Sequence, residues 1–269
     1  MKRAIGIFDS GIGGLTVTKE IIKHMPNEDI VYFGDTARVP YGNKSSETIQ
    51  KFSLEIANFL LGKNIKILVI ACNTASSYAL EYLQKMIDIP IVGVIEPGAE
   101  AACKITKNNK IGVIGTKGTI TSQSYHNTLK LINSELEIVN KACPLFVPLV
   151  EEGWIDKKVS YLVAEEYLAE LKNNGIDTLI LGCTHYPILK NVIAKVLGKK
   201  IQIVDSAVET AIKVKQILEE YNLLEQETLG MGYSLGKYVF YVSDDAEKFR
   251  EFGENILDRK IDKVEKVIF

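Results

Sequence analysis

The sequence predicts an α/β fold of two similar parallel-sheet domains, related by a pseudo-twofold duplication, with an active site in the cleft between them. Strand-like apolar runs alternate with helix-like segments along most of the chain, a pattern typical of parallel sheets covered by helices. Landmarks of the first half recur in the second half at an offset of about 110 residues. Two cysteines, Cys72 and Cys183, are among these landmarks, and each follows an apolar run.

Each element is expected where an apolar run or a helix-like segment occurs. In the first half, strands are expected at 4–9, 30–34, 66–71 and 89–95, and helices at 13–24, 46–62 and 75–86. The pattern begins again near Lys110. In the second half, strands are expected at 110–115, 136–141, 177–182 and 201–205, and helices at 121–132, 157–173, 187–197 and 207–221.

Three matched pairs of segments favour duplication of one α/β unit. The pairs are 5–7 with 111–113, Cys72 with Cys183, and 89–92 with 201–204. Any two α/β units share such patterns by chance, but three landmarks in the same order make duplication the better interpretation. The predicted domains are therefore 1–96 and 97–207, with residues 93–109 as the crossing between units.

The remainder of the chain, from about 208 to 269, departs from the repeat. It carries a glycine-rich run at 230–233, a strand-like run at 238–242 and a helix-like run at 246–257. We expect this tail to return and complete the first domain.

The composition is that of a soluble globular protein. Of the 269 residues, 46% are hydrophobic and 25% are charged, and the formal net charge of -2 argues against a general nucleic-acid or membrane-surface binder. The amino terminus is too short and polar for a signal peptide, and no apolar stretch is long enough to cross a bilayer, so we expect a cytoplasmic location. The four cysteines form no Cys-x-x-Cys pair, which indicates reduced thiols rather than a disulfide scaffold.

Cys72 and Cys183 are the strongest candidates for chemistry. Each is expected at the carboxyl end of a strand, where parallel sheets place their active sites, and at the start of a helix, whose dipole lowers the pKa of a thiol. A buried structural cysteine is the commoner fate of a single residue. Recurrence in both units, beside hydrogen-bonding residues, favours a functional role, whereas Cys103 and Cys143 lack such neighbours and are expected to pack.

Two turns are expected at the same sheet edge as these thiols. Asp9–Gly14 opens the first helix, and its glycines allow backbone amides to approach an anion. It lacks the third glycine of a dinucleotide fingerprint and the ending of a P-loop, so a plain tight turn is the alternative. Asp35–Gly42 follows the second strand, and its backbone and hydroxyl groups are candidates for holding a substrate carboxylate.

His185 and Glu151 are candidates for assisting Cys183. His185 lies two residues after that thiol, within reach for general acid or base work. A zinc site made of His185, the cysteines and Asp9 is disfavoured because the spacing matches no common zinc motif. Glu151 is expected near the Cys183 side of the cleft, and a solvated loop acid explains it equally well.

Taken in order, these motifs resemble the glutamate racemases, cofactor-independent enzymes of the aspartate/glutamate racemase superfamily. The resemblance covers the chain to about residue 225. It rests on Asp9–Gly14, Gly34–Thr36 with Pro40–Gly42, Ala71–Ala75, Glu96–Gly98 and Gly182–Pro187. Each motif is a modest signal alone, but all of them in this order and spacing are specific.

The resemblance implies reversible conversion of L-glutamate to D-glutamate for peptidoglycan synthesis, with no cofactor and no metal. It implies a two-base pair in which Cys72, assisted by Asp9, acts on D-glutamate, and Cys183, assisted by Glu151 and His185, acts on L-glutamate. Two thiols suit this reaction because one must remove the α-proton from one face while the other returns a proton to the opposite face. The substrate's charged groups would be held by Asp9, Ser10, Pro40, Tyr41, Gly42, Asn73, Thr74, Thr184 and His185, with Asp35 nearby. A homodimer is also expected, since family members commonly dimerise.

Three other functions stay open from the sequence. A racemase for aspartate or another acidic amino acid would use the same motifs. A non-catalytic amino-acid-binding protein would share the fold, but the paired thiols count against it. A zinc hydrolase would bind a metal and lose activity with a chelator.

Overall fold

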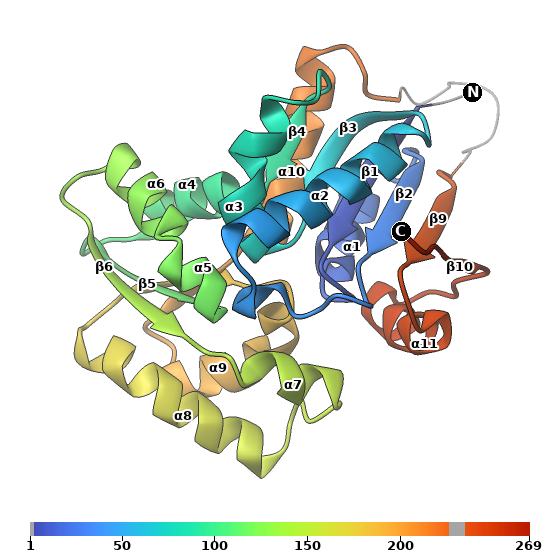
Figure 1. Ribbon diagram of the computed structural model, residues 1–269. Helices are drawn as coiled ribbons and strands as arrows, with labels where there is room; N and C mark the ends of the chain where they lie inside the picture. Colours follow the sequence, from blue (N-terminus) through green and yellow to red (C-terminus); the bar gives the residue numbers. More distant parts are fainter. Residues whose placement is uncertain (1–2, 226–234) are drawn as a thin grey trace.

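The computed structural model describes residues 3–225 and 235–269, which form two parallel sheets with helices on both faces of each (Figure 1). In this described part, the first sheet has the strand order β10-β9-β2-β1-β3-β4 and the second has the order β6-β5-β7-β8. Every strand pair is parallel. The predicted fold class is confirmed. The glycine-rich run at 230–233 lies outside the described residues.

The strands lie close to the predicted positions. They are β1 (Ala4–Asp9), β2 (Ile30–Gly34), β3 (Ile65–Ile70), β4 (Ile91–Gly93), β5 (Lys110–Gly115), β6 (Glu137–Ala142), β7 (Thr178–Gly182), β8 (Gln202–Asp205), β9 (Tyr238–Val242) and β10 (Val264–Lys266). The α-helices are α1 (Leu15–His24), α2 (Ser46–Leu61), α3 (Asn73–Gln84), α4 (Ile95–Ile105), α5 (Lys117–Thr121), α6 (Ser124–Ile132), α7 (Phe146–Glu151), α8 (Lys158–Asn173), α9 (Lys190–Leu197), α10 (Ser206–Glu220) and α11 (Ala246–Leu257). Two short 3₁₀ helices, η1 (Tyr41–Asn43) and η2 (Tyr186–Leu189), complete the described elements.

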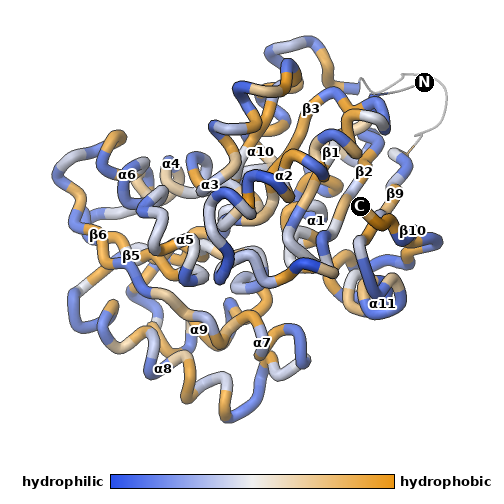
Figure 2. Tube along the Cα trace, viewed as in Figure 1, coloured by the Kyte–Doolittle hydropathy of each residue, from blue (hydrophilic) through white to orange (hydrophobic). Residues whose placement is uncertain are grey.

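Alternating side chains of the strands divide each core into two layers. Along β1, Ile5 and Ile7 pack with α1, α10 and α11, whereas Ala4 and Phe8 pack with α2 and α3. The inner strands β1, β3 and β7 are apolar on both faces because helices cover both faces, as in other all-parallel sheets. Figure 2 shows the result as apolar strands inside a more hydrophilic outer surface of helices.

The strand order also fixes where chemistry can occur. The order β2-β1-β3-β4 recurs as β6-β5-β7-β8. In each unit the second strand (β2 or β6) pairs on one side of the first strand (β1 or β5), and the third strand (β3 or β7) pairs on the other side. This reversal creates a topological switch point at the carboxyl ends of the first and third strands. Cys72 follows β3 and Cys183 follows β7, so each thiol lies at one of these switch points.

The tail adds to the first sheet. Strand β9 pairs with β2, and β10 pairs with β9. Helix α11 packs on α1, so the last elements of the chain lie beside some of the first, as the red and blue ribbons of Figure 1 show.

Three sequence predictions of secondary structure were wrong in detail. The crossing at 93–109 contains helix α4, so the strand expected at 89–95 is shorter than predicted. Pro97 is tolerated in this helix because it lies in the first turn, where a backbone N–H has no partner within the helix. The helix expected at 121–132 begins later, as α6 at Ser124, because Gln123 adopts a left-handed backbone with φ 58° that separates α6 from α5. The helix expected at 187–197 begins as η2 and continues as α9.

One further feature concerns the membrane. Within residues 3–225 and 235–269, no helix has both the length and the apolar character needed to cross a bilayer.

Candidate active site

The first half of the candidate site lies at the ends of β1 and β3. Cys72 is the N-cap of α3, and its Sγ accepts a hydrogen bond from the backbone N–H of Ala75 at 3.4 Å. The same thiol donates to Ser10 Oγ at 3.5 Å. Asp9, just before Ser10, is fully buried and accepts from the N–H of Gly11 at 2.9 Å. These contacts place a thiol, a hydroxyl and a carboxylate at one switch point.

The ionisation of Cys72 differs from the sequence prediction. A helix start was expected to lower the pKa of this thiol, but burial and the nearby charge of Asp9 raise it from 9.0 to about 12. The hydrogen bonds that join Cys72 to Ser10 and to the Ala75 N–H oppose this rise without cancelling it. Cys72 is therefore held as a neutral thiol.

The second half lies at the end of β7. Cys183 is buried, and its Sγ lies 3.9 Å from His185 Nδ1. The other ring nitrogen, His185 Nε2, lies 3.2 Å from Glu151 Oε1. The short helix α7, which the sequence interpretation did not foresee, carries Glu151 at its end. The three side chains form a continuous polar chain from thiol to carboxylate.

His185 is held as a cation within this chain. Burial alone lowers the pKa of an imidazole, but hydrogen bonds with Cys183 and Glu151 outweigh burial and raise the pKa of His185 from 6.5 to about 10. The same hydrogen bond lowers the pKa of Glu151. A cationic ring beside Cys183 attracts negative charge on its sulfur. The helix expected directly after Cys183 is absent there, since η2 begins at Tyr186, so the local charge comes from His185.

The two halves meet at Gly13 and Asp9. A Cβ at Gly13 would lie 2.3 Å from Thr184 Oγ1 and 2.5 Å from His185 Nδ1, so only glycine lets the first turn approach the second domain this closely. Thr184 Oγ1 lies 3.4 Å from Asp9 Oδ1. Burial raises the pKa of Asp9, and the charge of His185 and the amides of Gly14 and Gly11 only partly offset this rise.

The start of α3 supplies further hydrogen-bonding groups. Asn73 Oδ1 accepts from the Tyr125 hydroxyl at 2.8 Å, whereas Asn73 Nδ2 is buried and has no hydrogen-bond partner among the described residues. Thr74 Oγ1 lies 2.9 Å from Thr116 Oγ1 and 3.1 Å from Thr119 Oγ1. An unpaired buried N–H and a cluster of hydroxyls are suitable donors for a carboxylate ligand.

The turn after β2 approaches the same region. Pro40 is exposed and precedes η1, whereas the Tyr41 side chain is buried. The Tyr41 hydroxyl donates to Asp35, so it is not a free donor as the sequence interpretation allowed. A Cβ at Gly42 would lie 2.8 Å from Thr116 Cβ, so the turn packs directly on the second domain.

Sequence analysis missed the second-domain residues that support α3. Thr116, Thr119 and Tyr125 come from the start of α5 and from α6, and no motif in the sequence points to them. Thr116 directly follows β5, and β5 takes the place in the second sheet that β1 takes in the first. This correspondence with the turn after β1 was the one signal that could have pointed to Thr116.

No metal-ligating cluster accompanies these residues. Among the residues that the structure describes, no group of three or more His, Cys, Asp and Glu side chains is arranged to hold a metal ion.

Known proteins share this sequence and architecture. Residues 5–213 match the family described as Asp/Glu/hydantoin racemase. The chain belongs to this family. It is therefore a racemase, an isomerase, as its resemblance to that superfamily predicted.

The similarity to individual racemases extends along nearly the whole chain. A glutamate racemase of Geobacter metallireducens is 54% identical over 265 residues, which cover 98% of this chain and 96% of that protein. The crystal structure of glutamate racemase isoform RacE1 from Bacillus anthracis is 42% identical, covers 98% of this chain and 97% of its own, and superposes with a TM-score of 0.93. The Francisella tularensis glutamate racemase, solved in complex with D-glutamate, is 40% identical, with coverages of 100% and 98% and a TM-score of 0.91.

Proposed function

We propose that this racemase interconverts L-glutamate and D-glutamate, with Cys72 and Cys183 as the two bases. The observation that carries the proposal is the pair of buried thiols at equivalent switch points, each with its own polar partners. Inversion of a stereocentre requires proton removal on one face and proton delivery on the other. The high identity to named glutamate racemases supports glutamate as the substrate.

The two thiols have unequal surroundings. Burial beside Asp9 keeps Cys72 protonated, because its pKa is about 12. Cys183 Sγ lies 3.9 Å from Nδ1 of His185, whose pKa is raised to about 10. We propose that Cys72 is the acid in the L-to-D direction and that Cys183 is the base. Cys183 then acts on L-glutamate, the assignment that the resemblance to glutamate racemases implies.

The reaction also needs donors for the charge that develops on the substrate. The α-proton is a very weak acid, so the carbanion-like transition state needs oriented donors and little water. We assign the substrate's charged groups to Asn73 Nδ2 and the hydroxyls of Ser10, Thr74 and Thr184. The Tyr41–Gly42 backbone is a further carboxylate contact, since the tyrosine hydroxyl is committed to Asp35. The D-glutamate formed would enter peptidoglycan synthesis.

Chiral analysis of glutamate and aspartate turnover tests the proposal. The protein should convert each glutamate enantiomer to the other, and faster turnover of aspartate would contradict the substrate assignment. Cys72→Ser and Cys183→Ser should each lower kcat by about 100-fold or more, the usual contribution of a positioned acid or base. Cys103→Ser is the matched control and should leave kcat unchanged, because this half-buried thiol lies outside the site.

A further inference from the structure

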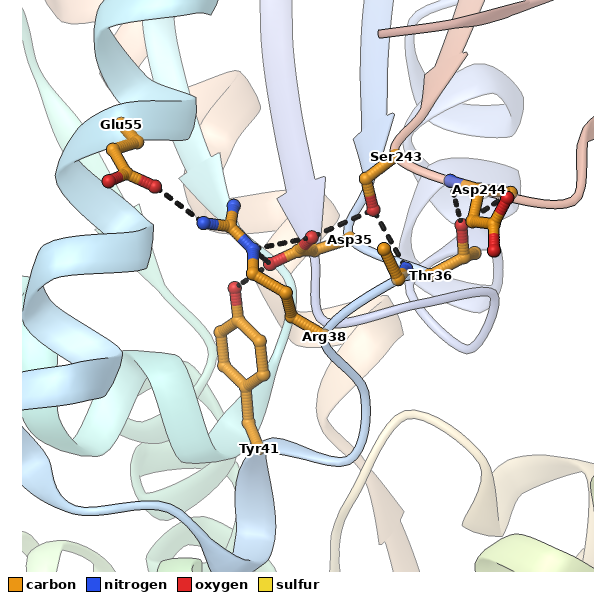
Figure 3. Close-up of polar contacts among 8 residues, drawn as sticks. Asp35, Thr36, Arg38, Tyr41, Glu55, Ser243 and Asp244 are labelled. Carbon is orange, nitrogen blue, oxygen red and sulfur yellow. Dashed lines mark hydrogen bonds and ion pairs between the residues drawn. The ribbon is translucent and has the colours of Figure 1, made fainter. Parts of the chain in front are cut away.

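A fully buried carboxylate lies behind the Tyr41–Gly42 turn. Asp35 follows β2 and has no solvent exposure. It accepts hydrogen bonds from Arg38 Nε at 2.9 and 2.7 Å, from Ser243 Oγ at 2.8 Å and from the Tyr41 hydroxyl (Figure 3). Both carboxylate oxygens are thus occupied by protein donors. Asp35 therefore binds the protein rather than the substrate.

The donors come from two segments that are far apart in the sequence. Arg38 and Tyr41 belong to the turn itself, whereas Ser243 follows β9 in the tail. Ser243 Oγ also accepts from the backbone N–H of Ala37 at 2.8 Å. Beside it, the N–H of Asp244 donates to Thr36 Oγ1 at 2.8 Å. These contacts join the turn after β2 to the end of β9.

Arg38 compensates the buried negative charge. Its Nη1 donates to Glu55 Oε2 of α2 at 2.5 Å, and its guanidinium carbon lies 4.0 Å from the centroid of the Phe52 ring. Burial acts to lower the pKa of Arg38, but the hydrogen bonds to Asp35 and Glu55 more than offset it. A buried carboxylate is tolerated where such a cation and full hydrogen bonding accompany it.

The opposite side of the turn lies against the second domain. Gly42 approaches Thr116 so closely that a Cβ would lie 2.8 Å from the threonine Cβ. Thr116 in turn lies 2.9 Å from Thr74 across the domain interface. A shift of the Tyr41 ring would therefore move the turn relative to α3.

We propose that Asp35 is a positioning residue, whose hydrogen bonds to Tyr41, Arg38 and Ser243 hold the Tyr41–Gly42 backbone where it binds a substrate carboxylate. The inference rests on the proposed function, since it takes glutamate as the ligand of that backbone. Asp35 acts through Tyr41, and the tail contributes to binding through Ser243. Loss of the anchor should weaken substrate and transition-state binding alike, because the thiols are on other elements.

Steady-state kinetics of Asp35→Asn and Tyr41→Phe test this role. Each variant is expected to raise KM for L-glutamate, by about tenfold for Asp35→Asn and by several-fold for Tyr41→Phe, because each loses a hydrogen bond involving a charged group. The kcat of both should stay within about twofold of the parent value. The double variant should resemble Asp35→Asn alone, since both changes break the same contact. Ser243→Ala leaves the sequence of the turn unchanged and should also raise KM for L-glutamate. If Asp35→Asn does not fold, the KM of Ser243→Ala tests the proposal in its place.

Asp177→Asn is the matched control. Asp177 also accepts hydrogen bonds from a nearby turn, including one from Thr106 Oγ1 at 2.7 Å, but it lies just before β7, at the end of the sheet opposite the thiols. The KM of Asp177→Asn for L-glutamate should equal that of the parent enzyme. Folded Tyr41→Phe and Ser243→Ala with parental KM, or a loss confined to kcat, would overturn the inference. A parent enzyme without glutamate racemisation would instead refute the proposed function.

Discussion

Replacing Glu151 with glutamine should lower the pKa of His185, and so weaken the charge beside Cys183. The substitution keeps the size of the side chain and removes its charge. His185 Nε2 lies 3.2 Å from Glu151 Oε1, with the His185 side chain 4% exposed and that of Glu151 26% exposed. The contact is therefore largely shielded from water, and its loss should be measurable.

The size of the shift follows from the strength of this contact. A hydrogen bond between charged groups contributes about 1.5–3 kcal/mol, and the partial exposure of Glu151 favours the lower end. One pKa unit corresponds to about 1.4 kcal/mol. The pKa of His185 should therefore fall from about 10 by roughly one unit in Glu151→Gln.

NMR titration of the imidazole C–H signals measures this shift directly. The chain has three histidines, so His24 and His126 serve as references in the same spectrum. The apparent pKa of the alkaline limb of the kcat/KM profile for L-glutamate should fall by a similar amount, because the His185 imidazolium that faces Cys183 would then lose its proton at a lower pH than in the parent enzyme. Glu152→Gln is the control. An unchanged His185 midpoint in Glu151→Gln, or an equal shift in the control, would refute the reasoning.

Two further predictions concern close packing and a buried ion pair. Gly13→Ala should lower kcat/KM by at least about tenfold, because its Cβ would lie 2.3 Å from Thr184 Oγ1 and 2.5 Å from His185 Nδ1 and would displace both side chains. Gly11→Ala is the control. Its Cβ would have no neighbour nearer than 3.5 Å, so kcat/KM should hardly change. Lys66→Ala should lower the free energy of unfolding in urea by about 3–5 kcal/mol. The change removes the cation that lies 2.6 Å from the Glu28 carboxylate, which is 1% exposed and would stay buried with its charge uncompensated. Lys110→Ala, which breaks an exposed pair, should cost at most about 1 kcal/mol, and equal losses in the two lysine variants would contradict the account.

Periodicity predicted most of the fold because β1, β2, β3, β4 and β7 are buried along their whole length and are apolar on both faces. Helix α4 escaped prediction since Pro97 and Gly98 are typical of turns, although both are compatible with a helix start. Sequence adjacency was sufficient to associate His185 with Cys183. The contact of Glu151 with that histidine depends on how α7 packs, which local sequence does not specify.

The electrostatics of the site could not be predicted from motifs. Cys72 does begin a helix, but burial next to Asp9 outweighs the hydrogen bonds with Ser10 and the Ala75 N–H, which reverses the expected direction of its pKa shift. The Asp35 contacts were hidden for a different reason. Ser243 reaches Asp35 only because β9 joins the first sheet beside β2, a long-range pairing that no local pattern reveals.

Isotope incorporation during the first turnovers of L-glutamate in deuterated water tests the two-thiol mechanism most directly. The resting Cys72 thiol exchanges with solvent, so it delivers deuterium, whereas Cys183 removes the α-proton from the other face. The account predicts that newly formed D-glutamate carries α-deuterium while recovered L-glutamate remains protiated. D-Glutamate that keeps its α-proton, or deuterium entering L-glutamate as fast as product forms, would contradict it.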